Sequence, residues 1–503
     1  MVYTRGPETQ GNACIMTLMA KGHSKNRRIV FVVPPVSMEE VFGEMGDVGN
    51  VLPFNGIMLL AGLTRHLGYE TYIIDSVALR LSKDQLLDRI RELQPHYIGF
   101  TATTLTVHKA GIMARLVKEQ IPDVMVLLGG PHVSAEPAKT VLKYHDIDVA
   151  VVGEGEDTLI ELLSFLDQER GDLEKVRGIA FVNDNGDAIL TGQRPLIEDF
   201  DPYPLPAWDL LPSIKEHYWP SPNNMNRLPA TCLVVTRGCP LGCTFCFNRC
   251  DPRNRRVRWF SVDKIMRMIT EMVNSYGIRE ITFLDDNMLA NRKMMKKLCQ
   301  RLIDDRLDLT WSCLGSTNFC DEETFRLMKR AGCWQISWGI EHARQEILDV
   351  YKKGIKVESM VEALRMARKC GLYNRAFFMH GNFLETKETI EDNIKYLKRL
   401  PIQEFHVSYF EPLPGTQAYH EVEKYGTWLI DPEDWEQYAL FDTPIFLPNG
   451  LTEDEVITSL RRMYKEFYLR PRVIWYYTFK MLRHPSTFVK LSRTALRFLN
   501  VFG

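Results

Sequence analysis

Short apolar runs alternate with amphipathic stretches along most of this chain, and this alternation constrains the fold more than any other feature. Between the runs, apolar residues recur at helical spacing, as in "SKDQLLDRIRELQ". Strand and helix in strict alternation predict an α/β domain with a doubly wound, Rossmann-like parallel sheet, which binds ligands at the carboxyl ends of its strands. The predicted strands of this first part lie at 28–35, 70–75, 96–102, 124–130 and 148–156.

These predicted strands end in glycine, proline and short polar residues. Because glycine has no Cβ, a ligand can approach the backbone closely at such positions. For Gly129 and Gly130 the alternative is a tight turn from strand to helix. The predicted ligand-binding edge comprises Pro35, Thr101, Thr103, Thr104, Gly129, Gly130, Pro131, His132, Gly153, Glu154 and Gly155.

A second alternation of strand and helix begins near residue 229. Its units are too few to close an eight-stranded barrel but sufficient for a partial one, in which the chemistry lies at the carboxyl ends of the strands. We therefore predict a partial (β/α)6 barrel. Its strands are expected at 230–238, 279–287, 309–317, 333–341, 373–382 and 404–415.

Changes in composition predict the domain boundaries. The stretch "EDFDPYPLPAWDLLP" concentrates proline and acidic residues, which is typical of an irregular linker. Just before it, Asn185-Gly186 predicts a hairpin turn. The expected order is a polar leader at 1–26, the doubly wound domain at 27–197, the linker at 198–228, the partial barrel at 229–430, and a helical, basic, amphipathic region at 431–503.

Composition excludes several classes of protein. The formal net charge of -2 gives no overall reason to expect a nucleic-acid partner. No run of about 18 apolar residues is present to predict a membrane span. The chain has 11 cysteines but no apolar stretch near its N-terminus that would suit a signal peptide, which argues against a disulfide framework. A cytoplasmic location is expected.

Three cysteines, Cys239, Cys243 and Cys246, crowd the stretch "RGCPLGCTFC" after the first predicted barrel strand. Zinc would require four tetrahedral ligands, and Cys250 could complete such a set. Catalytic thiol chemistry usually needs one or two cysteines, and structural thiols rarely cluster on a loop beside glycines. An iron-sulfur cluster fits best, because three thiolates bind three irons and the fourth iron stays open for a ligand.

The spacing C-x3-C-x-aromatic-C resembles the signature of the radical S-adenosylmethionine superfamily. The resemblance implies that the open iron chelates the amino and carboxylate groups of S-adenosylmethionine, with Phe245 against the adenine. Weaker matches add four groups of contacts. The residues implied are Asp285 and Asp286 after the second strand, Glu341 in "SWGIE", Gly381 with Glu385 in "HGNFLE", and Pro414 in "FEPLPGT". For Glu341 and Glu385 the alternative is an acid at a helix N-terminus, and for Asp285 and Asp286 a surface turn.

The first domain together with the partial barrel resembles the cobalamin-binding subgroup, which includes hopanoid methylases and the anaerobic magnesium-protoporphyrin monomethyl ester cyclase. The motifs "GFTATT", "LLGGPHVSAEP" and "VVGEGEDTL" carry this part of the resemblance. The implied cofactors are a 4Fe-4S cluster, S-adenosylmethionine and cobalamin. The family's Asp-x-His-x-x-Gly motif is replaced by "VVPPVSMEEVFGEMG", so cobalt would lack a histidine below it.

The resemblance implies methylation of an unactivated carbon through a 5'-deoxyadenosyl radical and methylcobalamin. An electron donor such as flavodoxin or ferredoxin would be required. An oxidative cyclase is the alternative with the same cofactors, and a non-catalytic corrinoid-binding sensor is the alternative of another class. The substrate is expected to be hydrophobic, of isoprenoid or hopanoid type, for the reason given next.

The C-terminal end is basic and apolar. After Glu466 it contains seven Lys or Arg residues and no acidic residue. Such a segment is typical of helices that lie on an anionic membrane surface, so we expect peripheral contact with the inner membrane face. The alternative is a helical lid over the mouth of the barrel.

Overall fold

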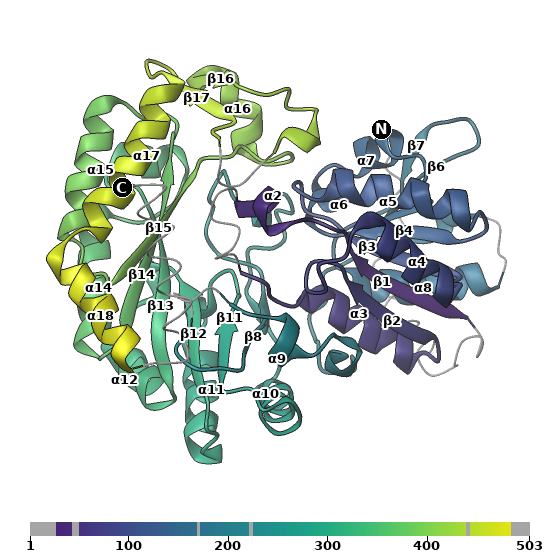
Figure 1. Ribbon diagram of the computed structural model, residues 1–503, viewed down its shortest axis with the longest axis horizontal. Coiled ribbons are helices and arrows are strands. Elements are labelled where there is room, and N and C mark those ends of the chain that lie inside the picture. The colour runs from purple at the N-terminus through teal and green to yellow at the C-terminus, as the bar shows by residue number, and fades with distance from the viewer. Residues whose placement is uncertain (1–26, 43–49, 169–171, 221–224, 439–442, 484–503) are drawn as a thin grey trace. The chain divides into compact units, whose positions relative to one another are not determined.

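The computed structural model describes residues 27–42, 50–168, 172–220, 225–438 and 443–483, which form two compact units (Figure 1). Of these residues, those up to Ser37 and within Phe54–Ser213 form the first unit. Those within Met38–Pro53 and Ile214–Gly503 form the second. The predicted leader at 1–26 and the basic end beyond residue 483 lie outside the described residues.

The first unit contains a seven-stranded sheet in the order β2-β1-β3-β4-β5-β6-β7. Strands β1 to β5 are parallel, whereas β6 and β7 form an antiparallel hairpin whose turn includes Gly186 at φ 82°. The doubly wound sheet is thereby confirmed. The strands are β1 (Arg28–Val33), β2 (Glu70–Asp75), β3 (Tyr97–Thr101), β4 (Met125–Gly129), β5 (Val149–Val151), β6 (Ile179–Val182) and β7 (Ala188–Leu190).

Helices flank this sheet, as the amphipathic stretches predict. Helix α4 shows why a helix begins where it does. The Ser82 hydroxyl accepts a hydrogen bond from the Gln85 amide, and the Gln85 side chain accepts one from the Ser82 amide, so the two residues cap the helix. Leu86, Leu87 and Ile90 form the buried face of this helix. The helices are α3 (Asn55–His66), α4 (Lys83–Leu93), α5 (Val107–Gln120), α6 (Pro131–Ala135), α7 (Pro137–Lys143) and α8 (Gly155–Asp167), with short turns η2 (Leu173–Lys175) and η3 (Trp208–Leu210).

The strand order reverses between β1 and β3, because the chain continues from β1 to β2 on one side and returns to β3 on the other. In open parallel sheets, ligands bind at such a switch point, beyond the carboxyl ends of the strands. The ends of β3 and β4 lie level, with Thr101 opposite Gly129. The fold therefore brings the predicted ligand-binding edge together.

Part of the predicted linker packs with the first unit. The Ala207 amide donates a hydrogen bond to the Met58 carbonyl of α3 (3.0 Å), and the Tyr203 hydroxyl donates to Asp157 of α8. Residues 50–53 instead belong to the second unit, where Val51 pairs with Trp219 and the Cys232 thiol lies 3.4 Å from the Pro53 carbonyl.

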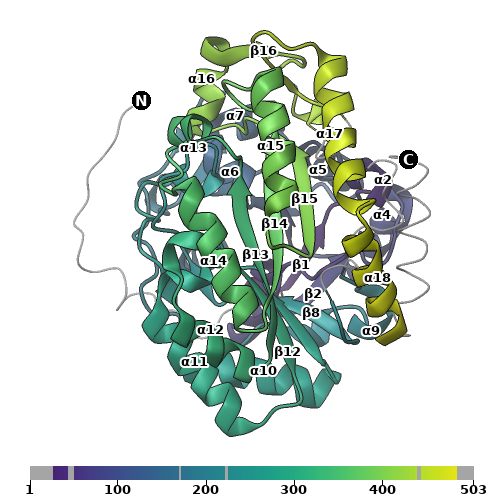
Figure 2. The ribbon, with the colours of Figure 1, turned by 90° about the vertical axis from the view of Figure 1, so that its left-hand side faces the viewer.

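The second unit contains a six-stranded parallel sheet in the order β15-β14-β13-β12-β11-β8, as expected for a partial barrel. Helices between the strands cover one face of it (Figure 2). The strands are β8 (Ala230–Leu233), β11 (Glu280–Phe283), β12 (Thr310–Gly315), β13 (Cys333–Glu341), β14 (Tyr373–His380) and β15 (Glu404–Tyr409). The covering helices are α10 (Val262–Tyr276), α11 (Arg292–Asp305), α12 (Glu322–Arg330), α13 (Gln345–Val350), α14 (Val357–Lys369) and α15 (Lys387–Arg399).

Smaller elements complete this unit. Two short antiparallel sheets pair β9 (Thr236–Arg237) with β10 (Arg258–Trp259), and β16 (Gly426–Trp428) with β17 (Phe446–Pro448). The short helices and turns are α2 (Met38–Phe42), α9 (Ile214–His217), η5 (Phe247–Arg249), η6 (Met288–Ala290), η7 (Thr317–Phe319), α16 (Gln417–Tyr425) and η8 (Trp435–Gln437).

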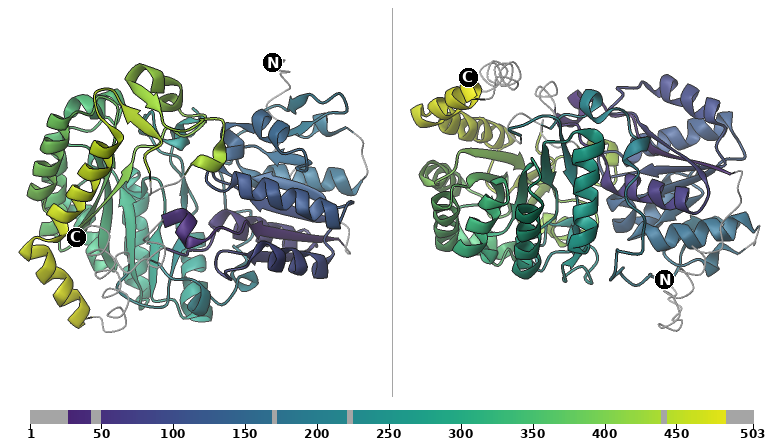
Figure 3. Two further views of the ribbon diagram at one scale, coloured as in Figure 1. Left: turned by 45° about the horizontal axis from the view of Figure 1, so that its top comes forward. Right: turned by 90° about the horizontal axis from the view of Figure 1, so that it is seen from below.

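Two helices at the C-terminal end, α17 (Glu453–Tyr468) and α18 (Pro471–Arg483), follow one another along the outside of this unit (Figure 3, yellow). Helix α17 packs on the edge strand β15, where the Phe405 ring lies 4.7 Å from that of Phe467. In α18, the Tyr476 ring contacts that of Tyr373, the first residue of β14. Helix α18 thus lies beside the amino end of this strand. None of the described helices is both long and apolar enough to cross a membrane.

Candidate active site

The three predicted cluster ligands lie on one loop at the carboxyl end of the first barrel strand. β9 and β10 pair with Arg237 opposite Arg258, so the intervening loop is closed at its base. At its start, Gly238 has φ 92°, and a Cβ there would lie 2.5 Å from the Arg256 carbonyl oxygen. Only glycine fits this position without displacing the backbone. We call residues 238–257 the cysteine loop.

Asp285 contacts the segment that leads into the cysteine loop. Its side chain is fully buried, and its Oδ1 accepts hydrogen bonds from the amides of Val235 (2.8 Å) and Thr236. Burial raises the pKa of Asp285 to about 7, although these hydrogen bonds oppose the change. Asp285 therefore positions the entry to the loop, and its contact with S-adenosylmethionine stays a prediction.

The residues after Asp285 also approach the loop. Asp286 accepts a hydrogen bond from the Asn248 side-chain amide (2.9 Å), and burial raises the pKa of this carboxyl. The Asn287 side-chain amide lies 4.0 Å from the Cys239 sulfur. Sequence reasoning did not identify Asn248 or Asn287 as site residues, since isolated asparagines in loops carry no distinctive pattern.

Of the three cysteines, Cys243 is buried, and Cys239 and Cys246 are half-buried. Burial raises the pKa of Cys239 and Cys243, and raises that of Cys246 to about 12. Positive charge from bound iron would reverse this effect, because coordination favours the thiolate. The donor set and its setting therefore fit an iron-sulfur cluster.

Zinc and an iron-sulfur cluster would use these cysteines differently. One zinc ion would require four ligands around a single position, with Cys250 as the fourth. Among the described residues, no three His, Cys, Asp or Glu side chains are gathered to hold a metal ion. A 4Fe-4S cluster differs in spreading its thiolates over separate irons.

Phe245 and Glu341, both predicted to contact S-adenosylmethionine, both lie close to Lys353. The Lys353 ammonium is 2.6 Å from Glu341 Oε1 and 5.7 Å from the centre of the Phe245 ring. Sequence reasoning missed Lys353, because "YKKG" has the composition of an exposed helix end. The same short stretch contains Tyr351, whose carbonyl accepts a hydrogen bond from the Thr244 amide (2.9 Å).

Glu341 ends β13 in an unusual backbone conformation, with φ 63°. Left-handed backbone is strained for residues other than glycine and is common at functional sites. A Cβ at Gly339 would lie 2.6 Å from Glu341 Oε1 and 2.8 Å from Lys353 Nζ. The glycine therefore provides the space in which the ion pair forms.

Glu385 connects the ends of β13 and β14 rather than facing solvent. It is 1% exposed, and its carboxylate accepts hydrogen bonds from the Asn382 amide (2.8 Å) and from His342 Nε2 (3.2 Å). His380 Nδ1 lies 3.6 Å from the same carboxylate. Burial alone would raise the pKa of Glu385, but the two histidines outweigh it and hold the pKa well below its usual range.

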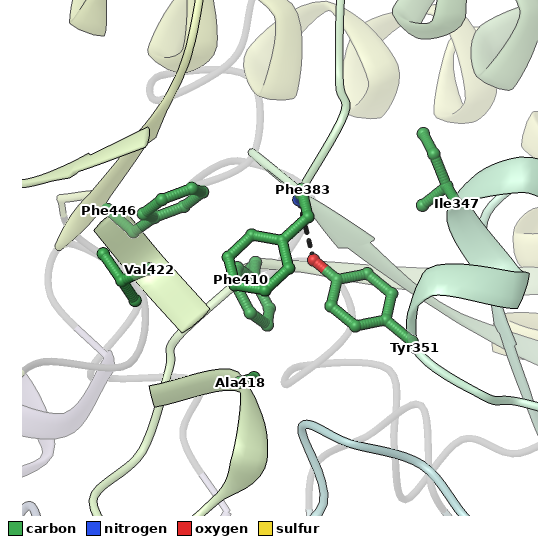
Figure 4. Packing of buried hydrophobic residues seen from close by; sticks show 7 residues of the cluster. All are labelled: Ile347, Tyr351, Phe383, Phe410, Ala418, Val422 and Phe446. Atoms are coloured by element: carbon green, nitrogen blue, oxygen red, sulfur yellow. Dashed lines mark hydrogen bonds between the residues drawn. The ribbon is translucent and has the colours of Figure 1, made fainter. Parts of the chain in front are cut away.

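Pro414 and Gly381 lie in the loops that follow β15 and β14. Gly381 has φ 74°, and Gly415, directly after Pro414, has φ 80°. These loops border an aromatic cluster in which Phe383 and Phe410 lie 4.9 Å apart (Figure 4). Phe245 packs against this cluster, which consists of Ile347, Tyr351, Phe383, Phe410, Ala418, Val422 and Phe446. The carboxyl ends of the last strands thus form an apolar wall behind Phe245.

The predicted cobalamin residues lie at one sheet edge. For some of them, the local backbone structure already accounts for the residue type. Gly130 has φ 116°, and a Cβ there would lie 2.4 Å from the Ala102 carbonyl oxygen, so it makes the tight turn. At Gly153, φ is 82° and a Cβ would meet nothing within 4 Å. Glu154 accepts a hydrogen bond from the Ile197 amide (2.7 Å). The open space at Gly153 fits close approach by a ligand.

His132 is buried, with 1% of its surface exposed. Its Nδ1 lies 3.1 Å from the Thr104 hydroxyl, and burial lowers the pKa of the imidazole to about 3. The ring is therefore neutral and enclosed. Among the predicted edge residues, Thr103 donates its amide to the Thr106 hydroxyl, and Pro131 and Gly155 begin α6 and α8. Contact of these residues with cobalamin stays a prediction.

Comparison with known proteins places this geometry in a family. A model described as the radical SAM superfamily matches residues 233–397, and a B12 binding domain model matches residues 45–163. An uncharacterized methyltransferase of Pyrococcus horikoshii is 31% identical to this chain. The match covers 90% of this chain and 94% of the length of that methyltransferase. An anaerobic magnesium-protoporphyrin IX monomethyl ester cyclase of Rubrivivax gelatinosus is 28% identical over 84% of this chain and 74% of its own.

A solved structure has the same fold. The radical S-adenosylmethionine methyltransferase TsrM of Kitasatospora setae, with a tryptophan substrate and an analogue of S-adenosylmethionine bound, gives a TM-score of 0.69. The match covers 89% of this chain and 90% of TsrM at 16% identity. Together with the cysteine loop and the doubly wound unit, these matches confirm the predicted family and its cofactors. The chain belongs to the cobalamin-binding radical S-adenosylmethionine family, whose enzymes use a 4Fe-4S cluster, S-adenosylmethionine and cobalamin.

Proposed function

We propose that this enzyme methylates an unactivated carbon of a hydrophobic substrate. The observation that carries the proposal is the cysteine loop, in which Cys239, Cys243 and Cys246 have the C-x3-C-x-aromatic-C spacing, in a chain that also matches a B12 binding domain model. When bound, the cofactors supply an electron to split S-adenosylmethionine into methionine and a 5'-deoxyadenosyl radical, and a methyl group on cobalt. The 31% identical methyltransferase supports this outcome.

The chain's own residues would bind and orient these groups. Cys239, Cys243 and Cys246 would hold the cluster, and Phe245 would lie against the adenine. Glu341 would accept hydrogen bonds from the ribose hydroxyls. Holding the reactants in fixed positions speeds the reaction, because they no longer have to meet by diffusion in the correct orientation. Further contacts with S-adenosylmethionine are proposed for Asp285, Asp286, Gly381 and Pro414.

The aromatic cluster would protect the reaction from water. Phe383, Phe410 and Phe446 are each at most 1% exposed, and Tyr351 is fixed by a hydrogen bond from the Phe383 amide (2.7 Å). A dry, rigid wall limits quenching of a radical by solvent, because it leaves no room for water beside the reacting groups.

The outer surface of α18 supports a hydrophobic, lipid-type substrate. Ile474, Trp475, Phe479 and Leu482 are between 50% and 69% exposed, whereas Val473 on the inner side is 3% exposed. An exposed apolar stripe on a helix with basic sequence beyond it suits an anionic membrane surface. The lid alternative does not describe α18, which lies beside the amino end of β14.

An oxidative cyclase is the second candidate, favoured by the 28% identical cyclase. The two functions differ in their products. A methyltransferase that uses methylcobalamin forms S-adenosylhomocysteine as well as 5'-deoxyadenosine, whereas a cyclase forms only the second.

The proposal is tested by anaerobic reconstitution with labelled S-adenosylmethionine, a one-electron reductant and a lipid extract. We expect a lipid that gains a labelled methyl group, with both nucleoside products. Replacing Cys239, Cys243 and Cys246 by alanine should abolish 5'-deoxyadenosine, whereas Cys250→Ala should retain it. Formation of 5'-deoxyadenosine without S-adenosylhomocysteine would instead indicate the cyclase. A purified protein that binds cobalamin but no iron would indicate the sensor.

A further inference from the structure

Lys353 is a buried cation that the established family chemistry does not explain. Its side chain is 8% exposed, and that of its partner Glu341 is 10% exposed. Lysine is rarely buried, because an ammonium group loses hydration in the interior and requires a compensating partner. Lys353 therefore does not serve as an ordinary surface lysine, and its buried charge requires another explanation.

The backbone holds Lys353 against the cysteine loop. Thr244, between two of the cysteines, donates its amide to the Tyr351 carbonyl (2.9 Å). On the other side of Cys243, a Cβ at Gly242 would lie 3.8 Å from the Lys352 carbonyl oxygen. The segment 351–353 thus runs along the part of the loop that contains Cys243.

The positive charge of Lys353 lies beside the cysteine loop. Its ammonium group is 2.6 Å from Glu341 Oε1. The same ammonium group lies 5.7 Å from the centre of the Phe245 ring, and Phe245 directly precedes the cluster ligand Cys246. The charge is therefore held between a carboxylate and the part of the loop that would bind the cluster.

We propose that Lys353 is a positioning residue whose buried charge favours the reduced state of the cluster, and that Glu341 limits how strongly the cluster experiences this charge. The inference rests on the proposed function only in requiring the cluster. Reduction transfers one electron from a low-potential donor, such as a flavodoxin or ferredoxin, to the cluster, and breaks no bond. A nearby cation stabilises the added negative charge, more so where water is excluded.

Substitutions at the ion pair should shift the midpoint potential in opposite directions. Lys353→Met removes the cation, so the cluster should become harder to reduce and its potential more negative. Lys353→Arg keeps the charge and should stay close to the wild type. Glu341→Gln leaves the ammonium uncompensated and should make the potential less negative. The potentials are measured by redox titration with electron paramagnetic resonance, on the reconstituted full chain without S-adenosylmethionine or substrate.

Lys352 provides a matched control. It is the preceding lysine, is exposed, and contacts Gln417 (3.2 Å). Lys352→Met should leave the potential unchanged. Equal potentials in wild type and Lys353→Met, or a more negative potential in Glu341→Gln, would overturn the inference. If Lys353→Met fails to retain a cluster, the sign of the shift in Glu341→Gln decides.

The potential is read before any turnover, so the two proposals can fail separately. Shifted potentials with no methylated product would contradict the proposed function but support the role of Lys353. Normal methylation with unshifted potentials would support the proposed function but contradict the role of Lys353.

Discussion

Gly238 determines whether the cysteine loop can form at all. It combines φ 92° with close approach to the Arg256 carbonyl, so an added Cβ meets both backbone strain and a clash. Gly242 is in the same loop, but a Cβ there would lie 3.7 Å from its nearest neighbour, an ordinary contact. Two glycines in one motif thus have different physical roles.

Gly238→Ala is expected to lose most of its iron, because the loop must shift before three thiols can reach one cluster. Iron and sulfide analysis after anaerobic reconstitution measures this loss. Gly242→Ala is the control and should retain its iron content. Full loading of Gly238→Ala would show that the loop tolerates the clash and that its geometry does not depend on this residue.

At the scale of secondary structure, the ends of β13 and β14 meet α17 in a buried polar network. Glu385 joins His342 after β13 to His380 at the end of β14, and His380 Nε2 lies 2.8 Å from the Ser459 hydroxyl of α17. Both histidines are fully buried. The network holds the strand ends that carry Glu341 and Gly381, so it supports the position of these predicted site residues.

Glu385→Gln should lower the free energy of unfolding by about 2 kcal/mol, because hydrogen bonds to a buried charge are lost. Chemical denaturation of the chain without cofactors measures this change. Glu388→Gln, at a side chain that is 79% exposed, should have little effect. Similar stability of both variants would contradict the role given to the network.

Helices and strands whose apolar residues recur at regular spacing were predictable from the sequence. Contacts between side chains far apart in the sequence were not. The expected strand at 333–341 matches β13. It was predictable because this apolar run lies between two amphipathic helical stretches. Asn185-Gly186 likewise identified its hairpin. Lys353 could not be found, since its partner Glu341 is 12 residues away and only the folded backbone brings the two together.

For the whole molecule, the sequence order does not coincide with the division into units. Residues 50–53 follow the first strand of the first unit but pack in the second, and residues 198–213 of the predicted linker remain in the first. A pattern of apolar residues predicts which segments are strands and helices, but not which core a connecting segment joins. The chain therefore crosses between the units more than once, and cutting it within the predicted linker would separate residues that pack together.

The proposed membrane contact is also tested on the whole molecule. Replacing Trp475 and Phe479 by glutamate should strongly reduce binding to vesicles of phosphatidylglycerol and phosphatidylcholine in a sedimentation assay. The reason is that both side chains, 63% and 55% exposed, would lose their apolar contact and gain charge repelled by the anionic lipid. Leu190→Glu, at an exposed leucine of β7, is the control. Unchanged binding would contradict a role for α18.

The position of α18 has a consequence for how a lipid would reach the site. The helix lies beside the amino end of β14, whereas the cysteine loop follows the carboxyl end of the parallel strand β8. A lipid drawn from a bilayer held by α18 would therefore have to pass from the amino ends of the barrel strands to their carboxyl ends before it meets the cysteine loop. Its transfer to the site would be a step separate from the chemistry.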